Sequence, residues 1–341
     1  MVAFELFTFI LGIVVLIVMH ELGHFVASRA LNVEVEEFGL GFPPRVSRLF
    51  RAWGTDFTLN AIPLGGFVRP KGENDPTIPG GLAAAKPWVR ITVYLAGPMT
   101  NLFIGVLIGA IFYYNMGKPV ENVVLIDQVV AESPAYLAGL RAGDRIVEVN
   151  GIAIDSREKL VDITSKNLGK PLEIVTLRGD ERVMISVVPR INPPDGQGAM
   201  GIVMTNPSEP ISLGAAVGQG FKATFDYIRG VLTLPVRMIQ GQAAPQEGRL
   251  VGYVGMFKMY QVFNPLLFFM VISISLGVIN LVPFPALDGG RILMTLPEIL
   301  FHRRIPARFE NALNLVGFAF LLVLLLYVNL QDFINPIQIP K

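Results

Sequence analysis

The sequence predicts a multi-pass α-helical membrane protein with a soluble α+β domain inserted between its second and third spans. Of the 341 residues, 52% are hydrophobic and 16% are charged, whereas an ordinary soluble domain is about 25% charged. Four long apolar stretches hold the excess hydrophobic residues. The segment between the second and third stretches alternates apolar and polar residues in the manner of β-strands.

Each apolar stretch can form a helix that crosses a bilayer, which takes about 17–25 residues. The stretches cover approximately residues 6–28, 91–114, 266–282 and 312–330. The first also has features of a signal peptide, but such leaders begin with basic residues, and here the only early charge is Glu5. A cleavable leader would also have no use for the ionisable motif at residues 20–24. We therefore expect four transmembrane helices.

The distribution of basic residues predicts the orientation of these helices. Lys and Arg are concentrated between the first and second spans and between the third and fourth spans. Loops rich in Lys and Arg stay in the cytoplasm. Both termini and the inserted domain should therefore lie outside the cytoplasm.

Composition limits the chemistry that is available to the chain. There is no cysteine, so disulfides and thiolate metal sites are excluded. The net charge of +1 gives no indication of nucleic-acid binding. Any metal site must therefore be built from His, Asp or Glu side chains.

The strongest chemical signal is His20-Glu21-Leu22-Gly23-His24 in the first span. On a helix, His20 and His24 lie one turn apart on the same face and can bind one zinc ion. Glu21 is then placed to take a proton from a water at the metal. Ionisable residues inside a span are costly, and by default they indicate a functional site. A solvated helix end is the alternative explanation.

A catalytic zinc site usually has three protein ligands, so a third ligand is expected elsewhere. The sequence candidates are His302, Glu34, Glu36, Glu37, Glu73 and Asp288. Asp288 is favoured because two prolines end the third span just before it, and two glycines after it should let the chain turn sharply. Both spans run inward, so Asp288 and His24 should lie at the same depth. His302 stands beside two arginines and is expected to be solvated.

The inserted segment contains a motif that resembles the core signature of PDZ domains. It runs from Ser133-Pro134 through Arg141-Ala142-Gly143-Asp144 to Asn150-Gly151. PDZ domains bind an extended peptide by adding it to a sheet edge. Far upstream of this motif, Gly39-Leu40-Gly41-Phe42 has the sequence of the carboxylate-binding loop of many PDZ domains. We interpret this match as a coincidence.

Together with the two motifs above, residues 280–290 (NLVPFPALDGG) resemble the site-2 protease family of intramembrane zinc metalloproteases, most closely its bacterial RseP-like branch. The resemblance implies one Zn²⁺ per chain, bound by His20, His24 and Asp288. It also implies that Glu21 is the catalytic acid and base. Asn280 is implied to position substrate or stabilise the oxyanion, although a helix-packing hydrogen bond is the alternative.

The resemblance extends to two further segments. Residues 56–69 are similar to the family's membrane-associated β-hairpin, expected here at about 33–70. Its Gly65, Gly66 and Phe67 would bind an unwound substrate. Gly97-Pro98-Met99-Thr100-Asn101 resembles a GxxxN element, in which Asn101 would contact substrate or serve helix packing. One PDZ signature is present, whereas well-known RseP-like enzymes have two, so a size-filter role for this domain is less certain.

The sequence thus predicts an N-terminal membrane half at 1–115, a PDZ domain at 116–206, a helical and amphipathic linker at 207–262, and a C-terminal membrane half at 263–341. The expected activity is hydrolysis of a transmembrane helix in a single-span substrate, such as an anti-sigma factor or a remnant signal peptide, in the bacterial inner membrane. The PDZ domain would bind a peptide or unfolded segment. An inactive PDZ scaffold and a transporter are the alternatives.

Overall fold

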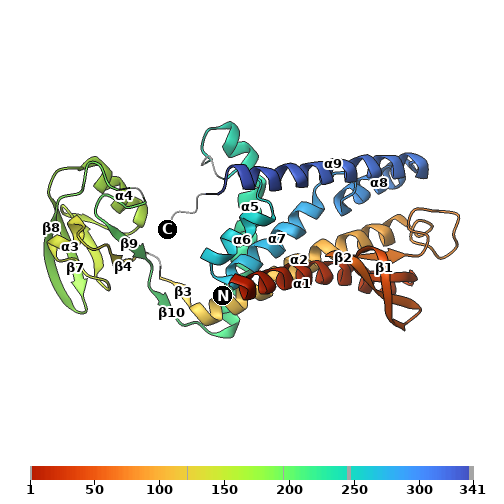
Figure 1. Ribbon diagram of the computed structural model, residues 1–341, viewed down its shortest axis with the longest axis horizontal. Helices are drawn as coiled ribbons and strands as arrows, with labels where there is room; N and C mark the ends of the chain where they lie inside the picture. Colours follow the sequence, from red (N-terminus) through yellow and green to blue (C-terminus); the bar gives the residue numbers. More distant parts are fainter. Residues whose placement is uncertain (1, 121, 195, 244–246, 338–341) are drawn as a thin grey trace. The chain divides into compact units, whose positions relative to one another are not determined.

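The protein is described from a computed structural model that covers residues 2–120, 122–194, 196–243 and 247–337. The chain forms two compact units. Unit 1 combines Met1–Phe112 with Val217–Gln338, and unit 2 is built from Tyr113–Ala216. Each unit is described by itself below, and Figure 1 gives the element labels.

Unit 1 is a helical membrane unit. In the described part of the chain, three of its helices are long and apolar enough to cross a bilayer: α1 (Val2–Ala30), α2 (Pro87–Met116) and α9 (Ala307–Ile334). A fourth apolar helix, α7 (Pro265–Leu281), is shorter at 17 residues. The protein is therefore a helical membrane protein. Of the four predicted spans, three correspond to long apolar helices and the fourth corresponds to this shorter helix.

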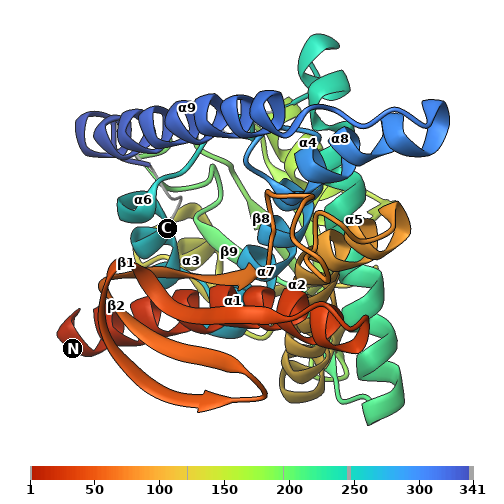
Figure 2. The same cartoon turned by 90° about the vertical axis from the view of Figure 1, so that its right-hand side faces the viewer.

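A β-hairpin lies alongside α1, as Figure 2 shows. Strands β1 (Val35–Ala52) and β2 (Thr55–Pro70) pair antiparallel with several bulges. Trp53 and Gly54 both adopt positive φ angles, the geometry of a tight two-residue hairpin turn. Phe25 of α1 packs with Val35 and Phe38 in a buried cluster. This cluster fixes the base of the hairpin to the helix that carries the histidines.

The segment after α7 differs from the sequence prediction. Asp288 is the first residue of a further helix, α8 (Asp288–Phe301), where a basic loop was expected. The glycines after it do not form a sharp turn. A Cβ on Gly289 would lie 2.3 Å from the carbonyl oxygen of Leu281, and one on Gly290 would lie 2.1 Å from that of Phe284. The glycines instead allow the start of α8 to pack against the preceding loop.

Two further helices lie in the predicted linker. They are α5 (Leu213–Ile239) and α6 (Tyr253–Val262). Helix α5 approaches α2 closely, because a Cβ on Gly109 would lie 3.0 Å from the Cα of Gly220. The N-terminus of α6 is held by Asp332 of α9, whose Oδ2 accepts hydrogen bonds from the backbone N–H groups of Gly252 at 2.7 Å and Gly255 at 3.0 Å.

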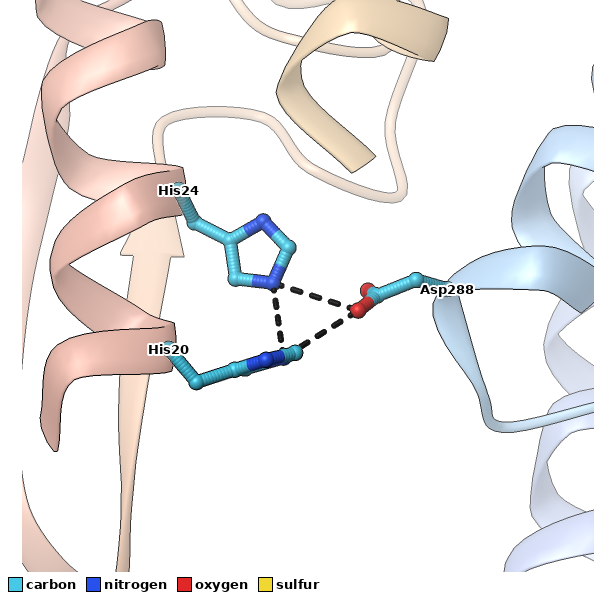
Figure 3. Close-up of side chains that lie close together, drawn as sticks. All are labelled: His20, His24 and Asp288. Carbon is cyan, nitrogen blue, oxygen red and sulfur yellow. Dashed lines mark hydrogen bonds and ion pairs between the residues drawn. The ribbon is translucent and has the colours of Figure 1, made fainter. Parts of the chain in front are cut away.

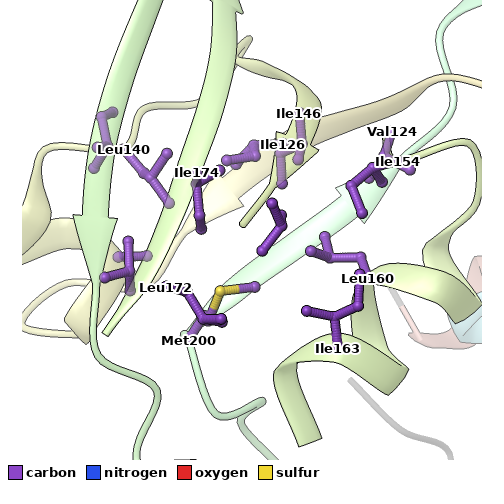
Figure 4. Packing of buried hydrophobic residues seen from close by; sticks show 14 residues of the cluster. Val124, Ile126, Leu140, Ile146, Ile154, Leu160, Ile163, Leu172, Ile174 and Met200 are labelled. Atoms are coloured by element: carbon purple, nitrogen blue, oxygen red, sulfur yellow. The ribbon is translucent and has the colours of Figure 1, made fainter. Parts of the chain in front are cut away.

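Unit 2 is an α+β domain, with a sheet in the order β8-β7-β5-β4-β9 and β6 paired to β5. Aliphatic side chains of the sheet and of α4 form its core, in which Leu160, Leu172 and Ile174 are fully buried (Figure 4). The elements are β4 (Val124–Val129), α3 (Pro134–Ala138), β5 (Arg145–Val149), β6 (Ile152–Ala153), α4 (Arg157–Lys166), β7 (Leu172–Arg178), β8 (Glu181–Val187) and β9 (Ile202–Thr205), with β3 (Lys118–Pro119) and β10 (Ser208–Glu209) as a separate pair.

The PDZ-like signature forms the short α3 and the turns around it. Ser133 caps the helix by accepting a hydrogen bond from the N–H of Tyr136. Gly139 ends the helix in the left-handed region at φ 91°. Asp144 is fully buried, and Arg178 donates to it from Nε and Nη2, both at 2.8 Å. The signature residues thus have defined structural roles in this domain.

Candidate metal centre

Helix α1 brings two imidazoles together inside unit 1. His20 and His24 are one helical turn apart, and their exposed fractions are 8% and 9%. Their Nε2 atoms lie 3.2 Å from each other (Figure 3). The i, i+4 spacing produces this geometry, because residues four apart share a helix face.

Asp288 reaches the same point from the start of α8 (Figure 3). Its Oδ2 lies 3.2 Å from Nε2 of His20 and 3.3 Å from Nε2 of His24. This oxygen is buried and accepts no hydrogen bond of acceptable geometry. Three ligand atoms, from residues 20, 24 and 288, therefore converge on one another.

The triangle fits a tetrahedral metal ion. Zinc binds imidazole nitrogen at about 2.0–2.1 Å, so two ligands at the tetrahedral angle are about 3.3 Å apart. The three observed edges are 3.2, 3.2 and 3.3 Å. Two neutral nitrogens and one carboxylate are also a ligand set that zinc accepts in catalytic sites. The fourth position is left for water or substrate.

Helix α2 packs closely against both imidazoles. A Cβ on Gly97 would lie 2.3 Å from Nε2 of His24 and 2.8 Å from Nε2 of His20. Nδ1 of His24 lies 2.8 Å from the carbonyl oxygen of Val93. Since that oxygen only accepts, Nδ1 carries the proton, and Nε2 presents its lone pair to the site. Asn101 is fully buried, and its Nδ2 lies 3.3 Å from Nδ1 of His20.

Glu21 is connected to the hairpin. Its Oε2 accepts a hydrogen bond from the backbone N–H of Val68 at 3.0 Å. Gly66 lies close by, and a Cβ there would be 3.5 Å from Cγ of Glu21. The backbone of β2 thus orients the carboxylate beside the two histidines.

These groups line one cavity of about 820 Å³ in unit 1. All nine residues that the sequence predicted for the site are among its lining residues, namely His20, Glu21, His24, Gly65, Gly66, Phe67, Asn101, Asn280 and Asp288. The Nδ2 group of Asn280 donates to the carbonyl oxygen of Leu276 at 3.0 Å within α7. Geometry therefore brings the predicted residues together, while their individual roles stay predictions.

The other candidates for a third ligand do not join the His20, His24 and Asp288 cluster, although Glu73 also lines the cavity. His302 is exposed at the end of α8. Glu37 is buried and pairs with Thr58 and Arg69, and Glu73 pairs with Arg291. Glu34 and Glu36 pair with Lys71 and Arg69.

Sequence reasoning missed several residues of the cavity wall. Phe42, from the loop interpreted as a coincidence, lines the cavity and packs against Gly65. Three residues of α9 line it as well, Phe318, Leu322 and Leu325. The local sequence does not distinguish these positions. An apolar residue in a span can face lipid, another helix or a cavity, and the sequence pattern is the same in all three cases.

The class of protein follows from the fold and the donor set. A buried His-His-Asp cluster, with a glutamate on the same helix as the histidines, is the arrangement of a zinc-dependent peptidase. Comparison with known proteins gives the family: the chain matches the model of "Peptidase family M50" over residues 8–324. The chain belongs to this family of metalloproteases, so the resemblance seen in the sequence is confirmed at the level of the family.

Similar proteins are found in several bacteria. A relative from Clostridium perfringens is 32% identical over 94% of this chain and 96% of its own length. One from Campylobacter jejuni is 32% identical over 96% of this chain and 93% of its own. Both carry the name "Putative zinc metalloprotease". The PDZ domain of an SdrC-like protein from Listeria monocytogenes covers 26% of this chain and 93% of its own length, at 25% identity and a TM-score of 0.23.

Proposed function

We propose that the protein is an intramembrane zinc endopeptidase that hydrolyses a peptide bond within a transmembrane helix of another protein. The observation that supports this most strongly is the placement of the His20, His24 and Asp288 cluster beside Glu21, in a cavity between apolar helices. A hydrolytic site in this position acts on chain segments that lie in the bilayer.

One zinc ion per chain would be held by His20, His24 and Asp288. When bound, zinc polarises the scissile carbonyl and lowers the pKa of the attacking water. Glu21 accepts a proton from that water and returns it to the leaving amine, so that one peptide bond and one water give a carboxylic acid and an amine. The N–H of Val68 holds the Glu21 carboxylate in place for both transfers.

Asn280 is proposed to act at the developing oxyanion. It lines the cavity from α7, and its amide donates to Leu276. A second amide proton remains for a substrate oxygen, and a preorganised donor in a dry site stabilises a developing negative charge.

The hairpin is proposed to hold the substrate in an extended form. Peptide bonds inside a helix are shielded, so the substrate must unwind first. Residues 66–70 of β2 pair with β1 on one side, and the N–H of Val68 points to Glu21 on the other. Because backbone groups alternate along a strand, Gly66 also turns its N–H toward the cavity, where a substrate strand can pair with it. Gly65 and Phe67 would complete this binding edge.

Unit 2 would bind an extended peptide or unfolded segment by strand addition, as PDZ domains do.

Both termini and unit 2 are proposed to lie outside the cytoplasm and the active site toward the cytoplasmic face. The absence of cysteine makes this testable with single-cysteine variants. Asp180→Cys, in an exposed turn of unit 2, should react with an impermeant maleimide added to intact cells. Trp53→Cys, at the hairpin tip, should react only after lysis, and the reverse pattern would overturn the orientation.

The function is tested with the purified protein in detergent. Wild type should hold about one zinc per chain and cut a model single-span substrate. Glu21→Gln should keep the zinc and lose cleavage, and Asp288→Ala should lose both. Cleavage by Glu21→Gln at the wild-type rate, or a wild type without stoichiometric zinc, would refute the proposal and favour an inactive scaffold.

A further inference from the structure

Asn101 lies behind His20, on the side that faces away from the cluster of ligand atoms. It belongs to α2, is fully buried, and has its carboxamide 3.3 Å from Nδ1 of His20. The hydroxyl of Ser273 in α7 donates to the backbone oxygen of Asn101 at 2.7 Å. The backbone of α2 is thereby fixed at the point where the Asn101 side chain meets the imidazole.

The direction of the contact follows from the position of the His20 proton. Nε2 of His20 is the nitrogen that faces Asp288 and His24, and a nitrogen can bind a metal only when it is unprotonated. The ring proton must therefore sit on Nδ1. A protonated Nδ1 needs an acceptor, and the carboxamide of Asn101 can supply one through Oδ1.

A half-turn of the Asn101 carboxamide provides this acceptor without moving any other group. In the arrangement shown, Nδ2 faces His20, while Oδ1 is buried and accepts no hydrogen bond. The two ends of the amide have nearly the same shape, so rotation places Oδ1 where Nδ2 stands. Before rotation Oδ1 is the end of the amide without a partner, and after rotation it is Nδ2. The His20 tautomer decides between the two forms, because only the rotated form leaves Nε2 free.

His24 shows the same relation on the same helix. Its Nδ1 meets the carbonyl oxygen of Val93 at 2.8 Å, two helical turns before Asn101 and with Gly97 midway. One face of α2 therefore places a polar group at the Nδ1 atom of each imidazole, the carbonyl of Val93 at His24 and the carboxamide of Asn101 at His20. Outer-shell partners of this kind orient metal-binding histidines and raise their basicity.

We propose that Oδ1 of Asn101 accepts the Nδ1–H of His20 and holds it in the tautomer whose Nε2 binds the metal. Asn101 is thus a positioning residue that acts through His20, and this inference rests on the proposed zinc site. It does not require Asn101 to touch the substrate.

The test measures zinc affinity in detergent by competition with a chelator. Asn101→Leu keeps the approximate volume but removes the acceptor, and its Kd for zinc should rise about 10- to 100-fold. Asn101→Asp keeps an acceptor and should bind zinc about as well as wild type. Gly105→Ala is the control: its added Cβ would meet Ile274 one turn further along α2, away from the imidazoles, and it should leave the affinity unchanged. The visible spectrum of Co²⁺-loaded protein should change in Asn101→Leu alone.

The outcomes separate this inference from the function on which it rests. Wild-type zinc affinity in Asn101→Leu would overturn the inference and leave the zinc protease intact. An equal loss in folded Asn101→Asp would also overturn it, because the amide would then act as a donor. A wild type that binds no stoichiometric zinc would instead refute the proposed function itself.

Discussion

Replacing Gly97 with alanine should remove the metal from the site while leaving the fold in place. The added Cβ would lie 2.3 Å from Nε2 of His24, whereas ordinary contact begins at 3.4 Å. The imidazole must therefore retreat by about 1.1 Å, while metal–ligand distances tolerate only about 0.2 Å. The same methyl group would lie 2.8 Å from Nε2 of His20, so both nitrogen ligands are displaced together.

The assay compares zinc content and cleavage of a single-span substrate in wild type and Gly97→Ala. We expect the variant to lose stoichiometric zinc, and its rate to fall at least about 100-fold, since a misplacement of 1 Å alone can have that effect. Gly105→Ala is the control on the same helix. Its Cβ would meet the side chain of Ile274 at 2.6 Å, so it disturbs packing but not the imidazoles, and it should keep its zinc. Full zinc and full activity in Gly97→Ala would refute the geometry of the site.

Three further predictions concern parts of the fold away from the metal. Asp144→Asn should destabilise unit 2, because the charge-assisted hydrogen bonds from Arg178 to the buried carboxylate are weakened. Hydrogen exchange on the full-length protein measures this, and unchanged protection would contradict it. Burial acts to raise the pKa of the Asp144 carboxyl, but hydrogen bonds from Arg178 and Arg141 hold that pKa below its usual range. The stabilisation of unit 2 by this pair should therefore be complete above about pH 4, the pKa of the carboxyl in the unfolded chain. It should be lost as the pH falls through the lower pKa of the folded protein, and Asp144→Asn should lack this pH dependence. Asp332→Ala should expose α6 to proteolysis, because the N–H groups of Gly252 and Gly255 lose their acceptor. Proteolytic cutting of α6 at the wild-type rate would show that this cap is dispensable.

The residues of the His-His-Asp cluster could be predicted from the sequence because much of their signal is local. His20 and His24 are placed by helix periodicity alone. Asp288 follows two prolines that come just after the end of α7, and the structure brings its Oδ2 to both imidazoles. A short stretch of sequence thus places the two histidines, whereas the approach of Asp288 also depends on how α8 packs against α1.

Features that depend on long-range packing could not be derived in this way. The glycines after Asp288 suggested a turn, but they allow close packing at the start of α8. The hydrogen bond from Val68 to Glu21 joins residues 47 positions apart. Likewise, Asn101 resembles any small polar residue of a packed helix until α1 is placed against it. Periodicity shows which face a residue occupies, but not which partner that face meets.

The proposed activity places the cut peptide bond within a membrane-spanning segment of the substrate. Mass spectrometry of both products from a single-span substrate tests this most directly, with wild type and Glu21→Gln run together. We expect one cut inside the apolar segment, made by wild type and absent from Glu21→Gln. A cut confined to the flanking soluble sequence, or the same products from both proteins, would contradict it.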